Sequence, residues 1–142
     1  MFNVPVAFKL KTNGKYIMKK NKREYELQTA VCSWLKARHP SIPFRSMPND
    51  VYKDKDHQDG RSHPDTLIMK PAGRWHGLAI EFKKDQATIY RKNGTIRQDK
   101  HLLDQLACMR DLLALGYLTA FIWSLDQGID IITKYLENGD AE

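Results

Sequence analysis

The sequence contains no hydrophobic run that approaches the ~20 residues of a membrane-spanning helix, and its first residues lack the apolar stretch and cleavage site of a signal peptide. We therefore expect a cytoplasmic protein with no membrane partner. Cysteine is also scarce: Cys32 and Cys108 lie far apart, each inside a helical pattern. This scarcity argues against a disulfide framework or a zinc knuckle and predicts two buried free thiols.

Two common metal-binding patterns are missing as well. Asp54, Asp56 and Asp59 could begin a calcium loop, but the glycine falls at the seventh position instead of the sixth, and the twelfth residue is Asp65 instead of glutamate. The five histidines show no close ligand spacing on one expected element. We therefore expect neither a calcium loop nor a histidine-bound metal.

The length of 142 residues predicts one domain, residues 1–142, with a single core. The net charge of +6 is unevenly distributed, because the basic residues before Glu24 and those from Lys83 to Lys100 contrast with an acidic C-terminal tail. Such asymmetry is typical of a surface that binds a polyanion, although charge also keeps a small protein soluble. The basic groups are Lys9, Lys11, Lys15, Lys19, Lys20, Lys22 and Arg23, then Lys83, Lys84, Arg91, Lys92, Arg97 and Lys100.

The most informative pattern that is present is Pro64-Asp65 followed, sixteen positions after the aspartate, by Glu81-Phe82-Lys83. Apolar and polar residues alternate through residues 77–84, which predicts a strand. Side chains of a strand point alternately to its two faces, so Glu81 and Lys83 should emerge on the same face. A carboxylate and an ammonium would then stand side by side.

A hairpin would bring a second carboxylate to this pair. Asp65 precedes a short apolar run, residues 67–69, and the turn at residues 71–73 predicts antiparallel pairing with the Glu81 strand. Two adjacent carboxylates repel each other unless a cation lies between them, and Mg²⁺ prefers oxygen ligands. Lys83 would then orient or deprotonate water beside a phosphodiester. The alternative is a solvated edge strand with Asp65 in a turn, because so short a motif also arises by chance.

The rest of the chain predicts a mixed sheet with helices packed against it. The first helix carries Glu24 and Gln28 four residues apart, at the head of an apolar stripe that continues through Val31 and Leu35. Residues 1–23 form either a hairpin around Asn13-Gly14 or a flexible basic arm. The other expected elements are a strand at 44–47, a turn at 91–95, a helix at 98–115, a strand at 118–123 and a helix at 127–136.

Taken together and in order, these motifs resemble the VRR-NUC family of the PD-(D/E)XK nuclease superfamily, from about Glu24 to Leu136. The resemblance implies an α/β, restriction-endonuclease-like fold with a mixed central β-sheet flanked by α-helices. The segments that carry it are Glu24-x-x-x-Gln28, Met47-Pro48-Asn49, the glycine-rich approach Gly60–Asp65, the block His76–Lys84, and Gln105, eleven residues before Gly116-Tyr117.

The resemblance also implies a role for each matching residue. Asp65, Glu81 and the backbone carbonyl of Phe82 would ligate Mg²⁺ or Mn²⁺, with no organic cofactor, and Lys83 would assist the nucleophilic water. Glu24 would touch the water shell of the metal, and Gln105 would support the site or contact the phosphate, with Gln98 as the alternative glutamine. The chain departs from the family at Ser62, where a glycine is usual, and in the expanded loop at residues 51–59.

Compact members of this family, often encoded by phages, act as homodimers on branched DNA such as four-way junctions. The resemblance therefore implies a metal-dependent, structure-specific DNA endonuclease, located in the host cytoplasm if a phage encodes it. No base-reading motif is present, which favours recognition of shape and backbone. The alternatives are a nuclease that cuts linear or single-stranded DNA and a DNA-binding module of the same fold that does not cut. We expect DNA contacts from Lys19, Lys20, Arg61, Lys84, Arg91 and Lys92.

Overall fold

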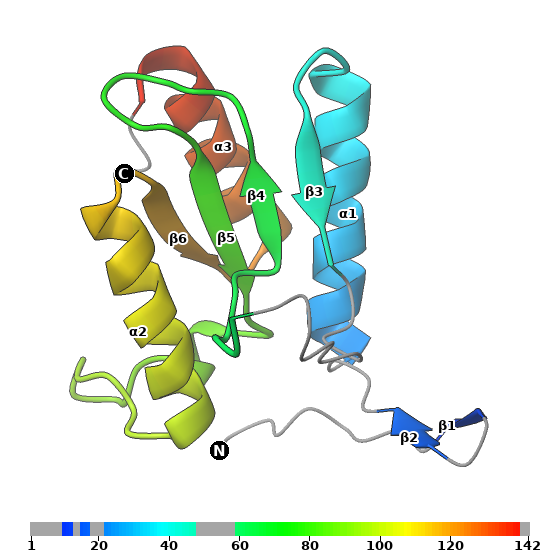
Figure 1. Ribbon diagram of the computed structural model, residues 1–142, viewed down its shortest axis with the longest axis vertical. Coiled ribbons are helices and arrows are strands. Elements are labelled where there is room, and N and C mark those ends of the chain that lie inside the picture. The colour runs from blue at the N-terminus through cyan, green and yellow to red at the C-terminus, as the bar shows by residue number, and fades with distance from the viewer. Residues whose placement is uncertain (1–9, 13–14, 18–21, 48–58, 140–142) are drawn as a thin grey trace.

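A four-stranded mixed sheet forms the centre of the protein (Figure 1). The computed structural model describes residues 10–12, 15–17, 22–47 and 59–139. In the sheet, antiparallel pairs join β3 to β4 and β4 to β5, and β6 runs parallel to β5. The mixed α/β sheet predicted from the sequence is therefore confirmed. The strands, in their order across the sheet, are β3 (Phe44–Ser46), β4 (Thr66–Ile68), β5 (Leu78–Phe82) and β6 (Leu118–Ile122).

Three helices cover the two faces of the sheet. One face carries α1 (Lys22–Arg38) and α3 (Leu125–Asn138), and the other carries α2 (Lys100–Ala114) (Figure 1). A parallel pair of strands needs a crossover connection, and α2 supplies it between β5 and β6. An antiparallel pair needs only a turn, so the short segment at residues 69–77 suffices between β4 and β5.

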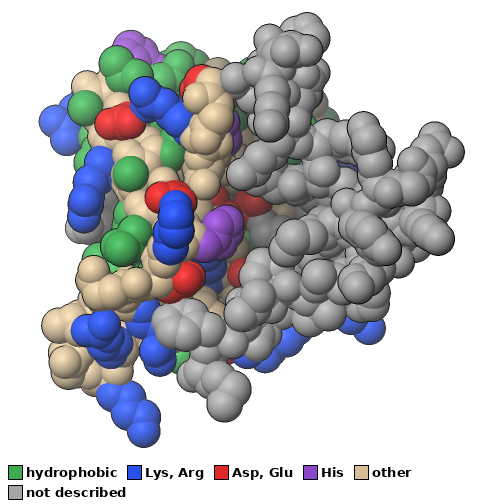
Figure 2. Space-filling model, turned by 60° about the horizontal axis from the view of Figure 1, so that its bottom comes forward, with side chains coloured by type: hydrophobic (Ala, Val, Ile, Leu, Met, Phe, Trp, Pro, Cys, Tyr) green, Lys and Arg blue, Asp and Glu red, His purple; other side chains and the backbone are tan. Residues whose placement is uncertain are grey.

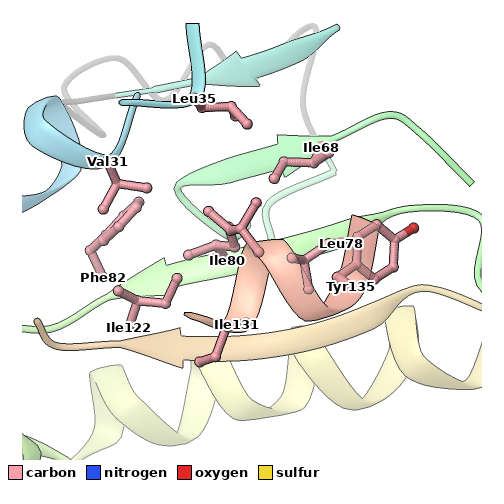
Figure 3. Close-up of a cluster of buried hydrophobic side chains, with 10 residues drawn as sticks. Val31, Leu35, Ile68, Leu78, Ile80, Phe82, Ile122, Ile131 and Tyr135 are labelled. Atoms are coloured by element: carbon pink, nitrogen blue, oxygen red, sulfur yellow. The ribbon is translucent and has the colours of Figure 1, made fainter. Parts of the chain in front are cut away.

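The main core lies between the sheet and the α1/α3 layer, where apolar side chains from the strands and both helices meet (Figure 3). Because α2 covers the opposite face, every residue of β5 is buried. Glu81 and Lys83 are only 2% and 7% exposed. The alternative in which they form the solvated face of an edge strand is therefore wrong, since β5 is an interior strand with neighbours on both sides. The labelled core residues are Val31, Leu35, Ile68, Leu78, Ile80, Phe82, Ile122, Ile131 and Tyr135.

The start of α2 differs from the expected position. The helix begins at Lys100, two residues later than the predicted start at residue 98, with an extended Asp99 before it. Arg97 is held to a short 3-10 helix, Gln86–Thr88, because its backbone N–H donates to Ile89 O at 2.9 Å and its Nε donates to Ala87 O at 2.6 Å. These bonds keep residues 97–99 outside the helix.

The prediction of two buried thiols is half right. Both cysteines are free; Cys108 is buried, whereas Cys32 is only partly covered. The buried stripe of α1 runs through Glu24, Gln28 and Val31, and Cys32 lies one residue beyond Val31, rotated toward the edge of that stripe.

The N-terminal segment contains two short strands, β1 (Leu10–Thr12) and β2 (Lys15–Ile17), which pair antiparallel with Leu10 opposite Ile17. This register fits the hairpin interpretation of the segment. The turn residues 13 and 14, Lys19, Lys20 and the Pro48-Asn49 motif lie outside the described residues. In the part of the chain that the structure describes, no helix has the length and apolar character needed to cross a membrane.

Candidate active site at one end of the sheet

The topology brings the candidate site residues to one end of the molecule. The beginning of β4, the ends of β5 and β6, and the N-terminal ends of α1 and α2 all lie there (Figure 1). Thr66 pairs with Ile80, so the antiparallel register places Asp65 opposite Glu81, one residue further along. The Phe82 backbone N–H donates to Asp65 Oδ2 at 2.8 Å. The predicted β4–β5 hairpin is confirmed, and it carries Asp65 to the strand that holds Glu81.

Lys83 reaches from the end of β5 toward α2. Its Nζ donates to Gln105 Oε1 at 2.5 Å, and both side chains are buried. A buried ammonium is costly unless it is hydrogen-bonded, so the Gln105 amide oxygen stabilises the charged lysine. Gln98, the alternative glutamine, is exposed before α2 and donates to Ile96 O at 3.2 Å. The geometry therefore supports Gln105 as the glutamine of the site.

The first turns of α1 carry a buried polar pair. Glu24 and Gln28 are both buried at the N-terminal end of the stripe that continues into the core. Gln28 Nε2 donates to Ser46 Oγ at 2.6 Å, and Ser46 Oγ lies 2.8 Å from Thr66 Oγ1. Sequence reasoning missed Ser46 and Thr66. Their only signal is position: Ser46 precedes the Met47-Pro48-Asn49 motif, and Thr66 follows Asp65.

The loop that leads to Asp65 is docked on α2. The Arg61 guanidinium forms an ion pair with Asp111, and Cys108 Sγ lies 4.0 Å from His63 Nδ1. Gln105, Cys108 and Asp111 are spaced by three residues and so share one face of α2. Thus one helical face meets both Lys83 and the loop before Asp65.

Hydrogen bonds within this loop and burial on α2 shift two pKa values. The Arg61 backbone N–H and the His63 ring both bond Asp59 Oδ1, at 2.9 and 2.8 Å, and they hold the pKa of the Asp59 carboxyl below its usual value. Burial raises the pKa of the Cys108 thiol, and the nearby Asp59 carboxylate adds to the effect. Near neutral pH the thiol is therefore protonated.

The basic residues expected to contact DNA occupy different surroundings. Lys84 is largely covered and lies 3.7 Å from Asp85, whereas Arg61 is about half exposed beside Asp111. Arg91 and Lys92 are exposed in the predicted turn, which the Tyr90–Ile96 bridge closes. Figure 2 turns the site end toward the viewer and shows acidic, histidine and basic side chains together in the middle, with further Lys and Arg side chains at the lower margin.

The donors at this end of the sheet fit a hard divalent cation. Among the described residues, His, Cys, Asp and Glu side chains do not gather in threes in a way that could hold a metal ion. The candidate set is two carboxylates, Asp65 and Glu81, with the Phe82 carbonyl. Mg²⁺ is typically bound by one or two carboxylates and keeps several waters, and such oxygen donors also suit Mn²⁺. The set therefore fits Mg²⁺ or Mn²⁺ and lacks the nitrogen and sulfur ligands of zinc sites.

Comparison with known proteins finds similarity among solved structures. Neither a protein-family model nor a curated protein matches the sequence. A solved structure described as a VRR_NUC domain protein superposes with a TM-score of 0.60 at 25% sequence identity, covering 84% of this chain and 95% of that chain. This similarity confirms the resemblance carried by the sequence motifs: the chain has the α/β, restriction-endonuclease-like fold of a VRR-NUC nuclease domain.

Proposed function

We propose that the protein is a Mg²⁺- or Mn²⁺-dependent endodeoxyribonuclease that hydrolyses phosphodiester bonds. The observation that carries the proposal is the burial of Glu81 and Lys83 at the end of β5, with the Asp65 carboxylate bonded to the backbone between them. Charged groups are rarely buried without a structural or chemical reason, and such clusters are typical of functional sites. The similarity to a VRR_NUC domain protein supports the same conclusion.

Each residue of the site has a distinct part in this proposal. Asp65, Glu81 and the Phe82 carbonyl would hold the cation, which when bound lowers the pKa of a water ligand and offsets charge on the phosphate. The Phe82 N–H fixes the orientation of the Asp65 carboxylate. Lys83, held by Gln105, would orient the attacking water as the ammonium, or deprotonate it as the neutral amine. Glu24, at the head of α1, would contact the water shell of the metal.

The proposed substrate is branched DNA, such as a four-way junction, bound by a homodimer that presents one site to each of two strands. The net charge of +6 and the exposed Arg91 and Lys92 support a nucleic-acid partner, because phosphate contacts provide sequence-independent affinity. The lack of a base-reading motif supports recognition of DNA shape.

The test is cleavage of a four-way junction, a flap, a linear duplex and a single strand by the purified protein with Mg²⁺ or Mn²⁺. We expect junction cleavage to be fastest, and Lys83→Ala to lower kcat by about 10²- to 10⁴-fold, the usual contribution of general acid–base catalysis. Asp65→Ala should abolish metal-dependent cleavage. Lys36→Ala, an exposed change in the last turn of α1, is the matched control and should cleave like wild type.

Two outcomes would contradict parts of the proposal. Binding of DNA without cleavage of any substrate, with either metal, would favour the non-cutting module. Equal rates on junction and linear duplex would leave the chemistry intact but refute structure selectivity. Size-exclusion chromatography with light scattering, with and without junction DNA, measures the number of subunits independently of cleavage.

A further inference from the structure

Three polar side chains form a continuous hydrogen-bonded chain that joins α1 to β3 and β4. Gln28 Nε2 donates to Ser46 Oγ at 2.6 Å, and Ser46 Oγ lies 2.8 Å from Thr66 Oγ1. Gln28 and Thr66 are each only 2% exposed, and Ser46 is partly covered. Ser46 and Thr66 stand directly opposite each other in the β3–β4 register. The chain therefore fixes α1, β3 and β4 in one relative arrangement.

The surroundings make this chain costly to break. Thr66 points to the same face of β4 as Ile68, which is fully buried in the core. A buried hydroxyl without a hydrogen bond is unfavourable, so Ser46 and Thr66 depend on their neighbours in the chain. Apolar side chains of similar size would pack in the same place without this requirement. The polar chain instead specifies how the helix and the strands align.

Both ends of the chain border on residues of the candidate site. Gln28 lies one helical turn after Glu24, and Thr66 directly follows Asp65. The middle is also connected, because the N–H of Met47, next to Ser46, donates to Asp65 O at 2.8 Å. A shift of α1 relative to β4 would therefore change the spacing between Glu24 and Asp65.

We propose that Gln28, Ser46 and Thr66 are positioning residues that set this spacing and thereby tune the affinity of the site for its divalent cation. The inference rests on the function proposed above, because it takes Asp65 as a ligand. Groups that hold metal ligands in place typically change metal affinity by 10- to 100-fold when they are removed. None of the three needs to touch the cation or the DNA.

The experiment compares Thr66→Val, which keeps the side-chain shape but loses the hydroxyl, with Thr66→Ser, which keeps the hydroxyl. Two quantities are measured. The first is the Mn²⁺ concentration that gives half-maximal cleavage. The second is the Mn²⁺ concentration that gives half of the maximal increase in the melting temperature of the protein without DNA. We expect Thr66→Val and Ser46→Ala to raise both values about tenfold. At saturating Mn²⁺ their kcat should stay within about threefold of wild type, and Thr66→Ser should behave like wild type.

The matched control is Tyr135→Phe. The Tyr135 hydroxyl donates to Lys70 O at 2.6 Å, so this change also removes one buried hydroxyl bond, but beyond the other end of β4. It should lower the melting temperature without changing either Mn²⁺ value. Gln28→Met removes the hydrogen bond between α1 and Ser46. It is the substitute variant if Thr66→Val does not fold.

The outcomes separate the inference from the proposed function. If wild type cleaves DNA with Mn²⁺ while Thr66→Val, Ser46→Ala and Gln28→Met keep its half-saturating concentrations, the positioning role is refuted and the nuclease stands. An equal shift in Tyr135→Phe would also refute it, because the effect would then follow from stability alone. If wild type is neither active nor stabilised by Mn²⁺, the proposed function fails and the inference with it.

Discussion

Among the residues of the site, Lys83 has the environment that matters most for stability, because its ammonium is buried. Its bond to Gln105 Oε1 lies in a region from which water is largely excluded, since both side chains are less than a tenth exposed. Removing one partner of a buried charged bond leaves a desolvated charge, whereas removing both partners leaves only a packing change. Stability should therefore respond differently to single and double substitutions.

We predict that Gln105→Leu lowers the free energy of unfolding by about 1–3 kcal/mol, because the lysine then lacks its acceptor. Adding Lys83→Met should recover most of that loss of stability, although cleavage should fall as in Lys83→Ala because the amine is gone. Urea unfolding of the two variants and of wild type measures both effects. Gln98→Leu, an exposed glutamine before α2, should change stability by less than about 0.5 kcal/mol. Equal stability of Gln105→Leu and wild type would show that the bond contributes nothing.

The sequence predicted which residues would stand together at this site, but not their burial. Strand periodicity places Glu81 and Lys83 on one face, and the turn at residues 71–73 brings Asp65 to the same strand. Periodicity does not say what covers that face. The covering element is α2, whose packing depends on contacts between segments far apart in the chain. Ser46 and Thr66 were not predicted for the same reason: their contact joins segments far apart in the chain, and a serine or threonine alone does not indicate its hydrogen-bond partner.

Among the elements, α2 has the widest influence on the site. Its face through Gln105, Cys108 and Asp111 meets first Lys83 and then the loop before Asp65. The Arg61–Asp111 pair is about half exposed on both sides, so water and salt weaken it. The reactivity of Cys108 is a better measure of whether the loop is docked, because this buried thiol lies against the loop at His63.

We predict that iodoacetamide modifies Cys32 faster than Cys108 at pH 8. Burial raises the pKa of the Cys108 thiol above its usual 9.0, and only the thiolate reacts. The rate of Cys108 modification should therefore still be rising with pH above 9.0. Peptide mass spectrometry measures both rates.

A loosened loop should change this result in a specific way. Arg61→Ala removes the pair with Asp111 and should accelerate Cys108 modification, while Arg110→Ala, an exposed change on the same helix, should not. If Cys108 reacts equally fast in wild type and Arg61→Ala, the loop does not protect it.

The helices were predicted from sequence patterns, but their ends were predicted less accurately. The existence and order of all three were predicted, yet α3 begins at Leu125 instead of 127 and ends at Asn138 instead of 136. Its caps were not predicted from the sequence: Ser124 Oγ accepts from Gln127 N at 3.2 Å, and Gly139 ends the helix with a φ of 74°. The start of α2 was not visible, because it depends on the tertiary bonds of Arg97.

On the scale of the whole molecule, the basic residues are not equivalent. Arg91 and Lys92 lie in the closed turn between β5 and α2, at the same end as the candidate site (Figure 1). Lys36 and Arg38 lie in the last turn of α1, at the opposite end. Both pairs are exposed and both contribute two positive charges. Only the first pair is placed to meet DNA that enters the site.

We therefore predict that Arg91→Ala combined with Lys92→Ala weakens binding to a four-way junction and reduces the slope of log K against log salt by about 1.8, at ~0.9 per lost phosphate contact. Lys36→Ala combined with Arg38→Ala removes the same charge and should leave the slope unchanged. Fluorescence anisotropy between about 50 and 200 mM salt, with EDTA to prevent cleavage, measures both. Equal slopes in the two double variants would mean that affinity follows net charge alone, whereas a loss confined to the first pair would locate the DNA beside Asp65, Glu81 and Lys83.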